Sequence, residues 1–238
     1  MHNLKAFGTD NLMRLFLIVC LVFLSACGRP MTDNEIAFAR TLHGDTLDAK
    51  SVRIVNGAPT RAVTFRREPR PRTTCRERIF PPATTEIVTS KPAAVAAYNH
   101  IMFDKDWYLD DYLPDYPDRV GLVAAMLFAH EVLHAWQWQN RADTGYSPWR
   151  AAFEHRGVAD PYLFELTSDP QFDDFGYEQQ GSIMEEYVCC RSLDPTAPRT
   201  ERLHALISQA MPVEPLPDGR TYAVGLPWDG VKVEGICR

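Results

Sequence analysis

The segment His130-Glu131-Val132-Leu133-His134 has the residue types and the spacing of a metal site. Side chains four residues apart on a helix lie one above the other on the same face, so both imidazoles can reach one metal ion. Glu131 is one step round the helix and can reach a water on that metal without being a ligand. Two histidines and a carboxylate suit Zn²⁺ best. The expected chemistry is metal-assisted hydrolysis, with Glu131 as the general base.

A buried helix is predicted to carry this segment, from about residue 119 to residue 140. Its apolar side chains are Leu122, Val123, Met126, Leu127, Leu133 and Trp136, which crowd it as the core of a protein requires. The alternative is a pair of surface histidines. Burying such polar groups without partners is costly, so the apolar setting favours metal ligands over that alternative.

The third ligand has to come from another part of the chain. A catalytic zinc site has three protein ligands and one open position. Asn140 stands where the third histidine of an extended HExxHxxGxxH motif would be. A second helix, predicted over residues 176–193, offers Glu178 as the third ligand. Glu185 shares its face and is either the alternative ligand or a carboxylate that orients a ligand histidine. Glu186 is the weaker candidate.

Glu178 followed by the small Gly181 resembles the glutamate helix of gluzincin-type HExxH metallopeptidases, which belong to the zincins. Gly181 replaces the usual alanine of that helix, and Ser182 replaces the usual acid. Residues 35–40, 52–54, 130–137 and 177–180 together look like a family of uncharacterised bacterial Vgr-related HExxH proteins. The resemblance covers roughly residues 32 to 192. It implies a zincin-like fold and supplies no substrate.

The predicted fold class is α+β: a mainly helical, zincin-like domain with a small N-terminal sheet, in which the HExxH helix packs on the glutamate-bearing helix. The expected strands are residues 52–55, 63–65, 86–89 and 98–103, and residues 162–166 are read as extended. Further helices are expected at residues 32–43, 147–155 and 200–211. Because residues 66–83 contain several prolines, we expect them to form an irregular loop. The strand at residues 98–103 is interpreted as a sheet edge that holds an extended peptide.

The N-terminal residues 1–26 are interpreted as a lipoprotein signal peptide. Ten apolar residues, 15–24, follow Lys5 and Arg14; this run is short for a bilayer span and suits a signal-peptide core. Leu24-Ser25-Ala26-Cys27 resembles a bacterial lipobox, which implies cleavage before Cys27 and lipidation of its thiol. Gly28, in place of Asp, implies the outer membrane. An ordinary signal peptide with a chance cysteine is the alternative. We therefore expect an exported bacterial lipoprotein at the periplasmic face of the outer membrane.

Export to an oxidising compartment predicts that the remaining cysteines form disulfides. They are Cys75, Cys189, Cys190 and Cys237, and four cysteines allow three pairings. Adjacent residues rarely satisfy disulfide geometry, so a Cys189–Cys190 bond is disfavoured. Cys75 and Cys237 are each expected to pair with one of the two adjacent cysteines. Both pairings of this kind stay open, and either would tie an N-terminal segment and the C-terminal tail to one helix.

Composition and charge limit the class of protein. The chain has 238 residues, of which 45% are hydrophobic and 24% charged, with a formal charge of −6. These values are typical of a globular protein and indicate no nucleic-acid partner. We expect residues 27–212 to form the metal-binding domain and residues 213–238 to form a tail packed on it.

The function favoured by these patterns is a zinc metallopeptidase that hydrolyses peptide bonds of a peptide or protein substrate at the cell envelope. His155, Tyr146 and Tyr187 are candidate donors to the oxyanion. One alternative is a non-catalytic zinc-binding envelope lipoprotein that acts in assembly or secretion. Its metal would be closed by a fourth protein ligand such as His100 or His155. Another is a zinc hydrolase of a non-peptide amide.

Overall fold

The computed structural model describes residues 28–66, 70–154, 160–166 and 169–238. The predicted signal peptide of residues 1–26, the lipidation residue Cys27 and the candidate His155 lie outside these described residues. Among the described helices, none combines the length and the apolar character that crossing a membrane requires.

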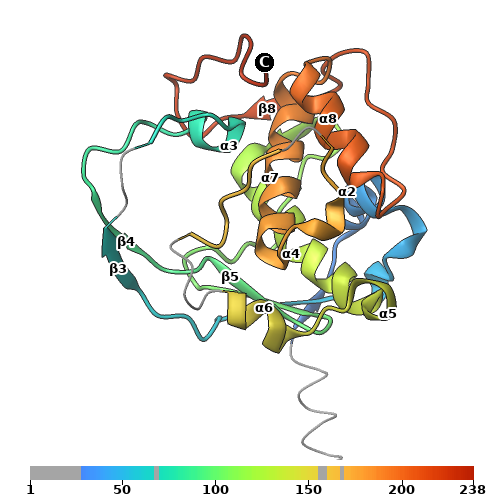
Figure 1. Cartoon of the computed structure of the whole chain (residues 1–238). Helices are drawn as coiled ribbons and strands as arrows, with labels where there is room; N and C mark the ends of the chain where they lie inside the picture. The colour runs from blue at the N-terminus through green and yellow to red at the C-terminus, as the bar shows by residue number, and fades with distance from the viewer. Residues whose placement is uncertain (1–27, 67–69, 155–159, 167–168) are drawn as a thin grey trace, which may run out of the picture.

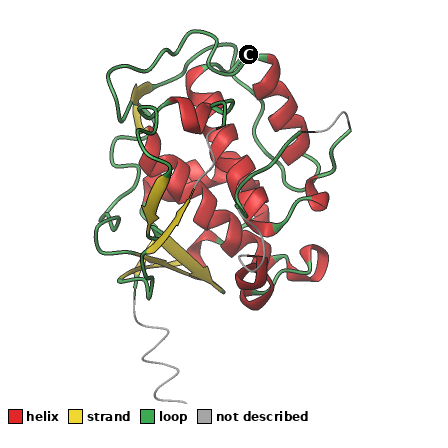
Figure 2. Ribbon diagram, turned by 60° about the vertical axis from the view of Figure 1, so that its left-hand side comes forward, coloured by secondary structure: helices red, strands yellow, loops and turns green. Residues whose placement is uncertain are grey.

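The predicted α+β class is confirmed, since the chain folds into helices packed beside small sheets (Figure 2). The helices are α2 (Asp33–His43), α3 (Cys75–Arg78), α4 (Leu122–Gln139), α5 (Arg141–Thr144), α6 (Pro148–Glu154), α7 (Tyr177–Leu193) and α8 (Pro198–Ile207). Single 3₁₀ turns occur at Gly44–Thr46, Ala49–Ser51 and Phe172–Asp174. Residues 162–166, predicted as extended, form a turn and an irregular segment.

The main sheet has the strand order β1-β2-β6-β5. Its strands are β1 (Arg29–Pro30), β2 (Arg53–Asn56), β6 (His100–Phe103) and β5 (Ala94–Ala97). β2 and β6 are parallel, with Ile54 opposite Ile101, and the other two pairs are antiparallel. The prediction that residues 98–103 form a sheet edge is therefore wrong, because β6 has a neighbour on each side. A tight turn at Tyr98, with a φ of 58°, folds β5 back along β6 and makes β5 the edge.

α4 is the central helix of the molecule (Figure 1). Its buried side chains lie all round it, and it packs against α7, β5 and β6. It begins at Leu122 rather than at residue 119, because residues 119–121 form a strand, β7 (Arg119–Gly121), with β8 (Ala223–Gly225) of the C-terminal tail. A buried helix of this kind holds its side chains rigidly, which is what a metal site needs.

Residues 57–66 and 70–93 leave the sheet between β2 and β5 and form an arm beside the body, on the left of Figure 1. The described part of the arm contains an antiparallel pair, β3 (Val63–Arg66) and β4 (Ile87–Ser90), and the short helix α3. The sequence predicted an irregular loop where α3 lies. The helix begins there because Thr74 and Glu77 form a reciprocal capping box, and the prolines flank the helix without interrupting it.

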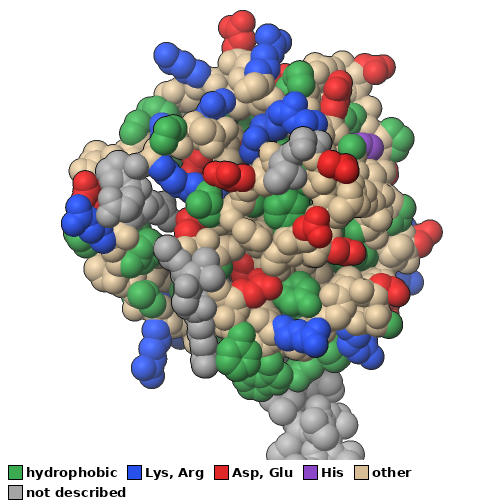
Figure 3. Space-filling view, viewed as in Figure 1, with side chains coloured by type: hydrophobic (Ala, Val, Ile, Leu, Met, Phe, Trp, Pro, Cys, Tyr) green, Lys and Arg blue, Asp and Glu red, His purple; other side chains and the backbone are tan. Residues whose placement is uncertain are grey.

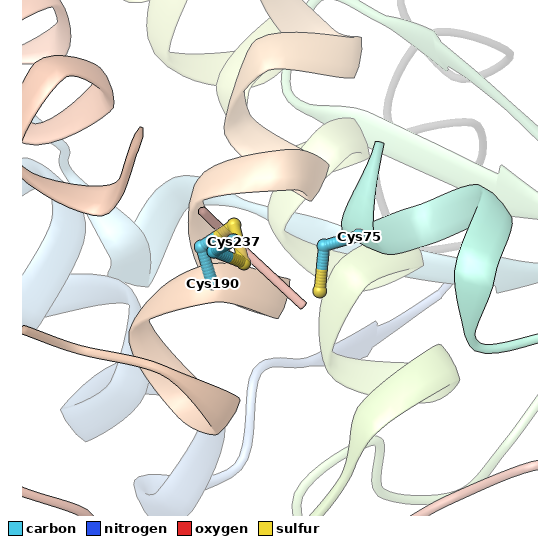
Figure 4. A group of neighbouring side chains, drawn as sticks. All are labelled: Cys75, Cys190 and Cys237. Atoms are coloured by element: carbon cyan, nitrogen blue, oxygen red, sulfur yellow. A yellow bond between two sulfur atoms is a disulfide. The ribbon is translucent and has the colours of Figure 1, made fainter. Parts of the chain in front are cut away.

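Two disulfides fix the arm and the tail to α7. Cys75 of α3 bonds to Cys189, and Cys237 of the tail bonds to Cys190. Cys75 and Cys237 thus each take one of the two adjacent cysteines. Cys75 and Cys237 lie next to Cys190 of α7 (Figure 4), and the three sulfur atoms are within 4.8 Å of one another. Disulfide sulfurs are not thiolates, so this group does not form a metal site.

Candidate metal centre

Three potential ligand atoms from α4 and α7 converge at one point. Nε2 of His130 lies 3.3 Å from Oε2 of Glu178, and Nε2 of His134 lies 3.6 Å from the same oxygen. All three side chains are buried, and this group is able to hold a metal ion. The two histidines come from adjacent turns of α4, as their spacing predicts. α7 lies alongside α4 and brings the carboxylate across from the facing helix (Figure 1).

The spacing of these atoms suits a tetrahedral ion. Ligand atoms 2.0–2.1 Å from the centre of a tetrahedron are about 3.4 Å apart, which is close to the two separations between the imidazoles and Glu178. Two imidazole nitrogens and a carboxylate oxygen form a ligand set typical of zinc at a catalytic site. The residues present therefore fit a metal ion with three protein ligands.

The electrostatics of this group also favour a cation. Burial by itself lowers the pKa of His130, but the carboxylates of Glu178 and Glu185 outweigh burial and raise that pKa well above its usual value. The pKa of His134 is also raised, since Glu178 outweighs the effect of burial. Positive charge at this point is therefore stabilised by the surrounding carboxylates, whether protons or a metal ion supply it.

Glu131, predicted from the sequence as the general base, follows His130 directly on α4. It is buried beside the two histidines, and its Oε2 has no hydrogen-bond partner among the described residues. Burial raises the pKa of this carboxyl group; the two imidazoles act against that shift, and Glu178 and Glu185 add to it. A buried carboxylate oxygen without a partner lowers stability, and it is available to accept a proton from a water molecule.

Gly181 lets α7 approach the metal ligands. A Cβ atom at this position would lie 2.5 Å from Cε1 and 2.6 Å from Nε2 of His130. Real Cβ atoms do not come so close to other heavy atoms, so any side chain at this position would displace the imidazole. The glycine, which replaces the alanine of the gluzincin pattern, is therefore required by the distance between the helices.

Glu185 lies on the far side of the His130 ring. Its Oε1 is 2.8 Å from Nδ1, off the axis of the ring N–H, whereas Nε2 faces Glu178. The other carboxylate oxygen, Oε2, accepts a hydrogen bond of 2.7 Å from Arg76. Of the two roles predicted for Glu185, this placement favours orienting the ligand His130 over binding the metal.

Glu186 points away from the metal centre, which corrects its prediction as a weaker candidate ligand. Its carboxylate accepts hydrogen bonds from the backbone N–H groups of Cys75 and Arg76, at 2.9 and 3.1 Å, and from Arg199 at 2.6 Å. On α7 a one-residue step rotates the side chain by about 100°, so Glu185 and Glu186 serve different neighbours.

A glutamine relay orients the second histidine and was not predicted from the sequence. Oε1 of Gln137 lies 2.8 Å from Nδ1 of His134, and the amide of Gln137 donates to Gln180 at 2.7 Å. Gln180 in turn donates to the backbone oxygens of Phe172 and Phe175. The sequence spacing could have predicted the contact between Gln137 and His134, because residues three apart share a helix face.

The start of α7 is held by a carboxylate from α6. The two oxygens of Glu154 accept hydrogen bonds from the backbone N–H groups of Tyr177 and Glu178, at 3.0 and 3.1 Å. A negative charge at a helix N-terminus satisfies free N–H groups and the helix dipole. Glu154 therefore fixes the end of the helix that carries the third ligand.

Two tyrosines lie close to the ligands. The ring of Tyr146 stacks on His134 at a centroid distance of 5.9 Å, and the ring of Tyr162 lies 6.1 Å from His130. Burial and then the carboxylates of Glu178 and Glu131 raise the pKa of both phenols. Tyr146 was predicted as a possible donor, whereas Tyr162 was missed because it lies in an irregular segment without periodicity.

Tyr187 is not at the metal centre, contrary to its prediction as a donor. Its ring packs near His204, and burial raises its pKa to about 12, with Arg191 and Tyr222 as its charged or polar neighbours. It lies nine residues after Glu178 on α7, which at about 100° per residue puts it on the opposite face of the helix from Glu178. His100, the other candidate closing ligand, lies on β6 and is not a member of the ligand group.

A cavity of about 710 Å³ runs between the arm and α4 and reaches Glu185. The space-filling view shows the surface hollowed between the arm and the body (Figure 3). Its inner wall is apolar: Val123, Met126, Leu127 and Trp107. Met126 and Leu127 precede His130 by four and three residues, so this wall lies one turn before the candidate ligands on α4, and Glu185 is the lining residue that contacts His130.

Comparisons with known proteins add one structural neighbour. No protein-family model matches the chain, and no curated protein matches it. The chain is similar to the effector domain of Pseudomonas aeruginosa VgrG2b, with 21% sequence identity and a TM-score of 0.49. The match covers 79% of this chain and 86% of that chain. A VgrG effector domain is thus a structural neighbour of this chain, and membership of the zincins stays a prediction.

Proposed function

We propose that this chain is a zinc-dependent peptide hydrolase of the gluzincin type. The observation that carries the proposal is the ligand group of His130, His134 and Glu178, at separations that suit a tetrahedral ion, beside the unpartnered buried carboxylate of Glu131. A three-ligand group leaves one position open, which is typical of catalytic rather than structural zinc.

His130, His134 and Glu178 would hold the zinc ion. When bound, zinc would polarise the substrate carbonyl and acidify a water molecule. Glu131 would take the proton from the attacking water and pass it to the leaving amine. Its raised pKa brings it nearer to neutral pH, where a general base is most effective. The raised pKa values of Tyr146 and Tyr162 keep their hydroxyls protonated, so that either can donate to the oxyanion.

The shape and lining of the cavity beneath the arm favour a polypeptide as the substrate. Its apolar inner wall on α4 ends one turn before His130, and its outer wall, residues 80–86, belongs to the arm. A groove bounded in this way suits a chain with bulky apolar side chains better than a small polar amide. The free edge of β5, next to Ala93 of the cavity wall, offers backbone groups to an extended peptide.

Export and lipid anchoring are part of the proposal. They rest on the apolar core of residues 15–24 and on the lipobox-like Leu24-Ser25-Ala26-Cys27. The two disulfides support the same interpretation, because disulfides persist in oxidising compartments such as the periplasm. Mass spectrometry of the protein isolated from membranes would test it. The expected result is a diacylglycerol-modified Cys27 at the N-terminus.

The metal and the chemistry are tested together on purified residues 28–238. We expect one zinc per chain, lost in His134→Ala and in Glu178→Ala. We expect Glu131→Gln to keep the zinc and to lose about 10²–10⁴-fold in the rate of peptide hydrolysis, the range for a lost general base. Loss of zinc in Glu131→Gln would show that this carboxylate is structural. A zinc-loaded chain without hydrolysis of any peptide library would indicate the non-catalytic envelope lipoprotein instead.

A further inference from the structure

We infer that the Cys75–Cys189 disulfide and Arg76 are parts of the metal centre: together they hold Glu185 against the ligand His130. Of the proposed function, only metal binding at this site is required for the inference. Peptide hydrolysis is a separate property, and its absence would leave the role of Arg76 unchanged.

The first step is the anchoring of α3 on α7. Cys75 is joined covalently to Cys189. The backbone N–H groups of Cys75 and Arg76 donate to the buried carboxylate of Glu186, at 2.9 and 3.1 Å. A four-residue helix has little stability of its own. Its position beside α7 (Figure 1) therefore depends on this bond and on these contacts.

The second step is the placement of one guanidinium group. With α3 anchored, Arg76 donates a hydrogen bond of 2.7 Å to Oε2 of Glu185. The other oxygen of Glu185 lies 2.8 Å from Nδ1 of His130. The side chains of Arg76 and Glu185 are 24% and 19% exposed, so water screens this contact only in part. Arg76 thus fixes the carboxylate that faces the ligand histidine.

The third step is the effect on the histidine. A carboxylate at Nδ1 favours the tautomer with its proton on that nitrogen. Nε2 then presents its lone pair toward Glu178 and the metal position. Arg76 is a positioning residue in this scheme, because it acts on His130 through Glu185.

Other arginines of the arm have different contacts. Arg70 pairs with Glu77 and with Asp160, at 2.8 and 3.8 Å. Arg72 donates to the backbone oxygens of Glu77 and Phe80. Both line the same cavity as Arg76, but these bonds end within the arm or at Asp160. Arg70 therefore provides a matched control for a lost positive charge in the cavity.

A consequence is that the metal affinity depends on the state of the cysteine pair. In thiol–disulfide exchange, the Cys75 and Cys189 thiols lose two protons and pass two electrons to an acceptor disulfide, which becomes a dithiol. The oxidised chain holds Arg76 at Glu185, whereas the dithiol chain relies on the non-covalent contacts alone. We therefore expect the site to bind metal more tightly after oxidation.

The test measures the affinity of metal-free protein for Zn²⁺ by competition with a chromophoric chelator, in purified residues 28–238 without reductant. Arg76→Ala and the double variant Cys75→Ser/Cys189→Ser are expected to weaken binding about tenfold, the lower end of the range for residues that orient metal ligands. Arg70→Ala and Cys190→Ser/Cys237→Ser are expected to stay within twofold of the parent. Circular dichroism confirms that each variant is folded.

A combined variant keeps the inference falsifiable. If the disulfide acts through Arg76, adding Arg76→Ala to Cys75→Ser/Cys189→Ser weakens binding little further. Arg76→Ala with the affinity of Arg70→Ala would overturn the inference, even if the cysteine variant failed to fold. Equal losses in the two cysteine variants would also overturn it, because a general loss of stability would then explain both.

Discussion

At the residue scale, the candidate site combines ligands with side chains that aim them. Nε2 of each histidine faces Glu178, and each Nδ1 lies 2.8 Å from a side-chain oxygen, that of Glu185 at His130 and that of Gln137 at His134. The two acceptors differ in charge, one a carboxylate and the other an amide. The first makes His130 the more basic imidazole. In the proposed metal site, His130 would therefore be the more strongly donating of the two imidazole ligands.

A buried histidine outside the site makes the stability depend on pH. Burial lowers the pKa of His43 to about 3, from a usual 6.5. Its ring stacks near Trp136, and both ring nitrogens lack a partner among the described residues. The folded chain keeps this histidine neutral, whereas the unfolded chain protonates it below pH 6.5. The unfolded state thus binds more protons between pH 6.5 and 3, and stability falls as the pH falls through this window.

His43→Leu is expected to remove that dependence. Between pH 7 and pH 5 the free energy of unfolding of the parent should drop by about 2 kcal/mol more than that of the variant, given these pKa values. Urea unfolding of chelator-treated protein at both pH values measures the difference. Because the metal ligands are unchanged, they contribute equally to both proteins. An equal drop in the free energy of unfolding of parent and variant between pH 7 and pH 5 would show that His43 is not buried in its neutral form.

At the element scale, the centre depends on two facing helices that approach closely. α4 carries two of the candidate ligands and the proposed general base, and α7 carries the third candidate ligand and Glu185. Glu154 holds the N-terminus of α7, and Gly181 allows the contact with His130. The ligand geometry is therefore a property of the helix pair rather than of either helix.

Gly181→Ala tests this close approach. Alanine favours the helix by about 1 kcal/mol over glycine, so the helix itself should not suffer. The added Cβ would overlap the ring of His130, and we expect the affinity for zinc to fall at least tenfold. Ser182→Ala, at the next position of α7, is the matched control. It removes a buried hydroxyl that has no hydrogen-bond partner among the described residues. Zinc affinity of Gly181→Ala equal to that of the control would mean that the helices lie further apart.

At the scale of the whole molecule, segments distant in the sequence are fastened to α7. The arm is tied through Cys189 and the tail through Cys190. The tail also adds β8 beside β7, and Arg78 of the arm donates to the backbone oxygen of Ile236 in the tail. Arm and tail thus support each other at the end of α7 that is remote from Glu178.

Removing the tail disulfide is expected to reduce stability without affecting the metal. The bond closes a separation of 47 residues, for which the chain-entropy relation gives about 4 kcal/mol. Denaturant unfolding of Cys190→Ser/Cys237→Ser should show a loss of roughly 3–4 kcal/mol, with the affinity for zinc retained. A variant that unfolds at the same denaturant concentration as the parent would contradict the prediction.

Features that lie within one helix could be predicted from the amino-acid sequence alone. The spacing of His130 and His134 fixes their shared face, because helix geometry depends only on local backbone angles. The apolar surroundings predicted a buried helix, and disulfide geometry made a bond between Cys189 and Cys190 unfavourable. The resemblance to gluzincins indicated Glu178, which the structure places beside both histidines.

The way the elements meet emerged only from the folded chain. Three features depend on the paths of the connecting segments. They are the bond between Cys75 and Cys189, the position of β6 inside the sheet, and the contact of Glu186 with α3. Arg76 reaches Glu185 across 109 residues of sequence. No local pattern encodes such a contact, since it follows from the packing of the arm against α7. Contacts between segments that are distant in the sequence depend on core packing and on chain connectivity. Both are properties of the whole chain and cannot be predicted from one segment.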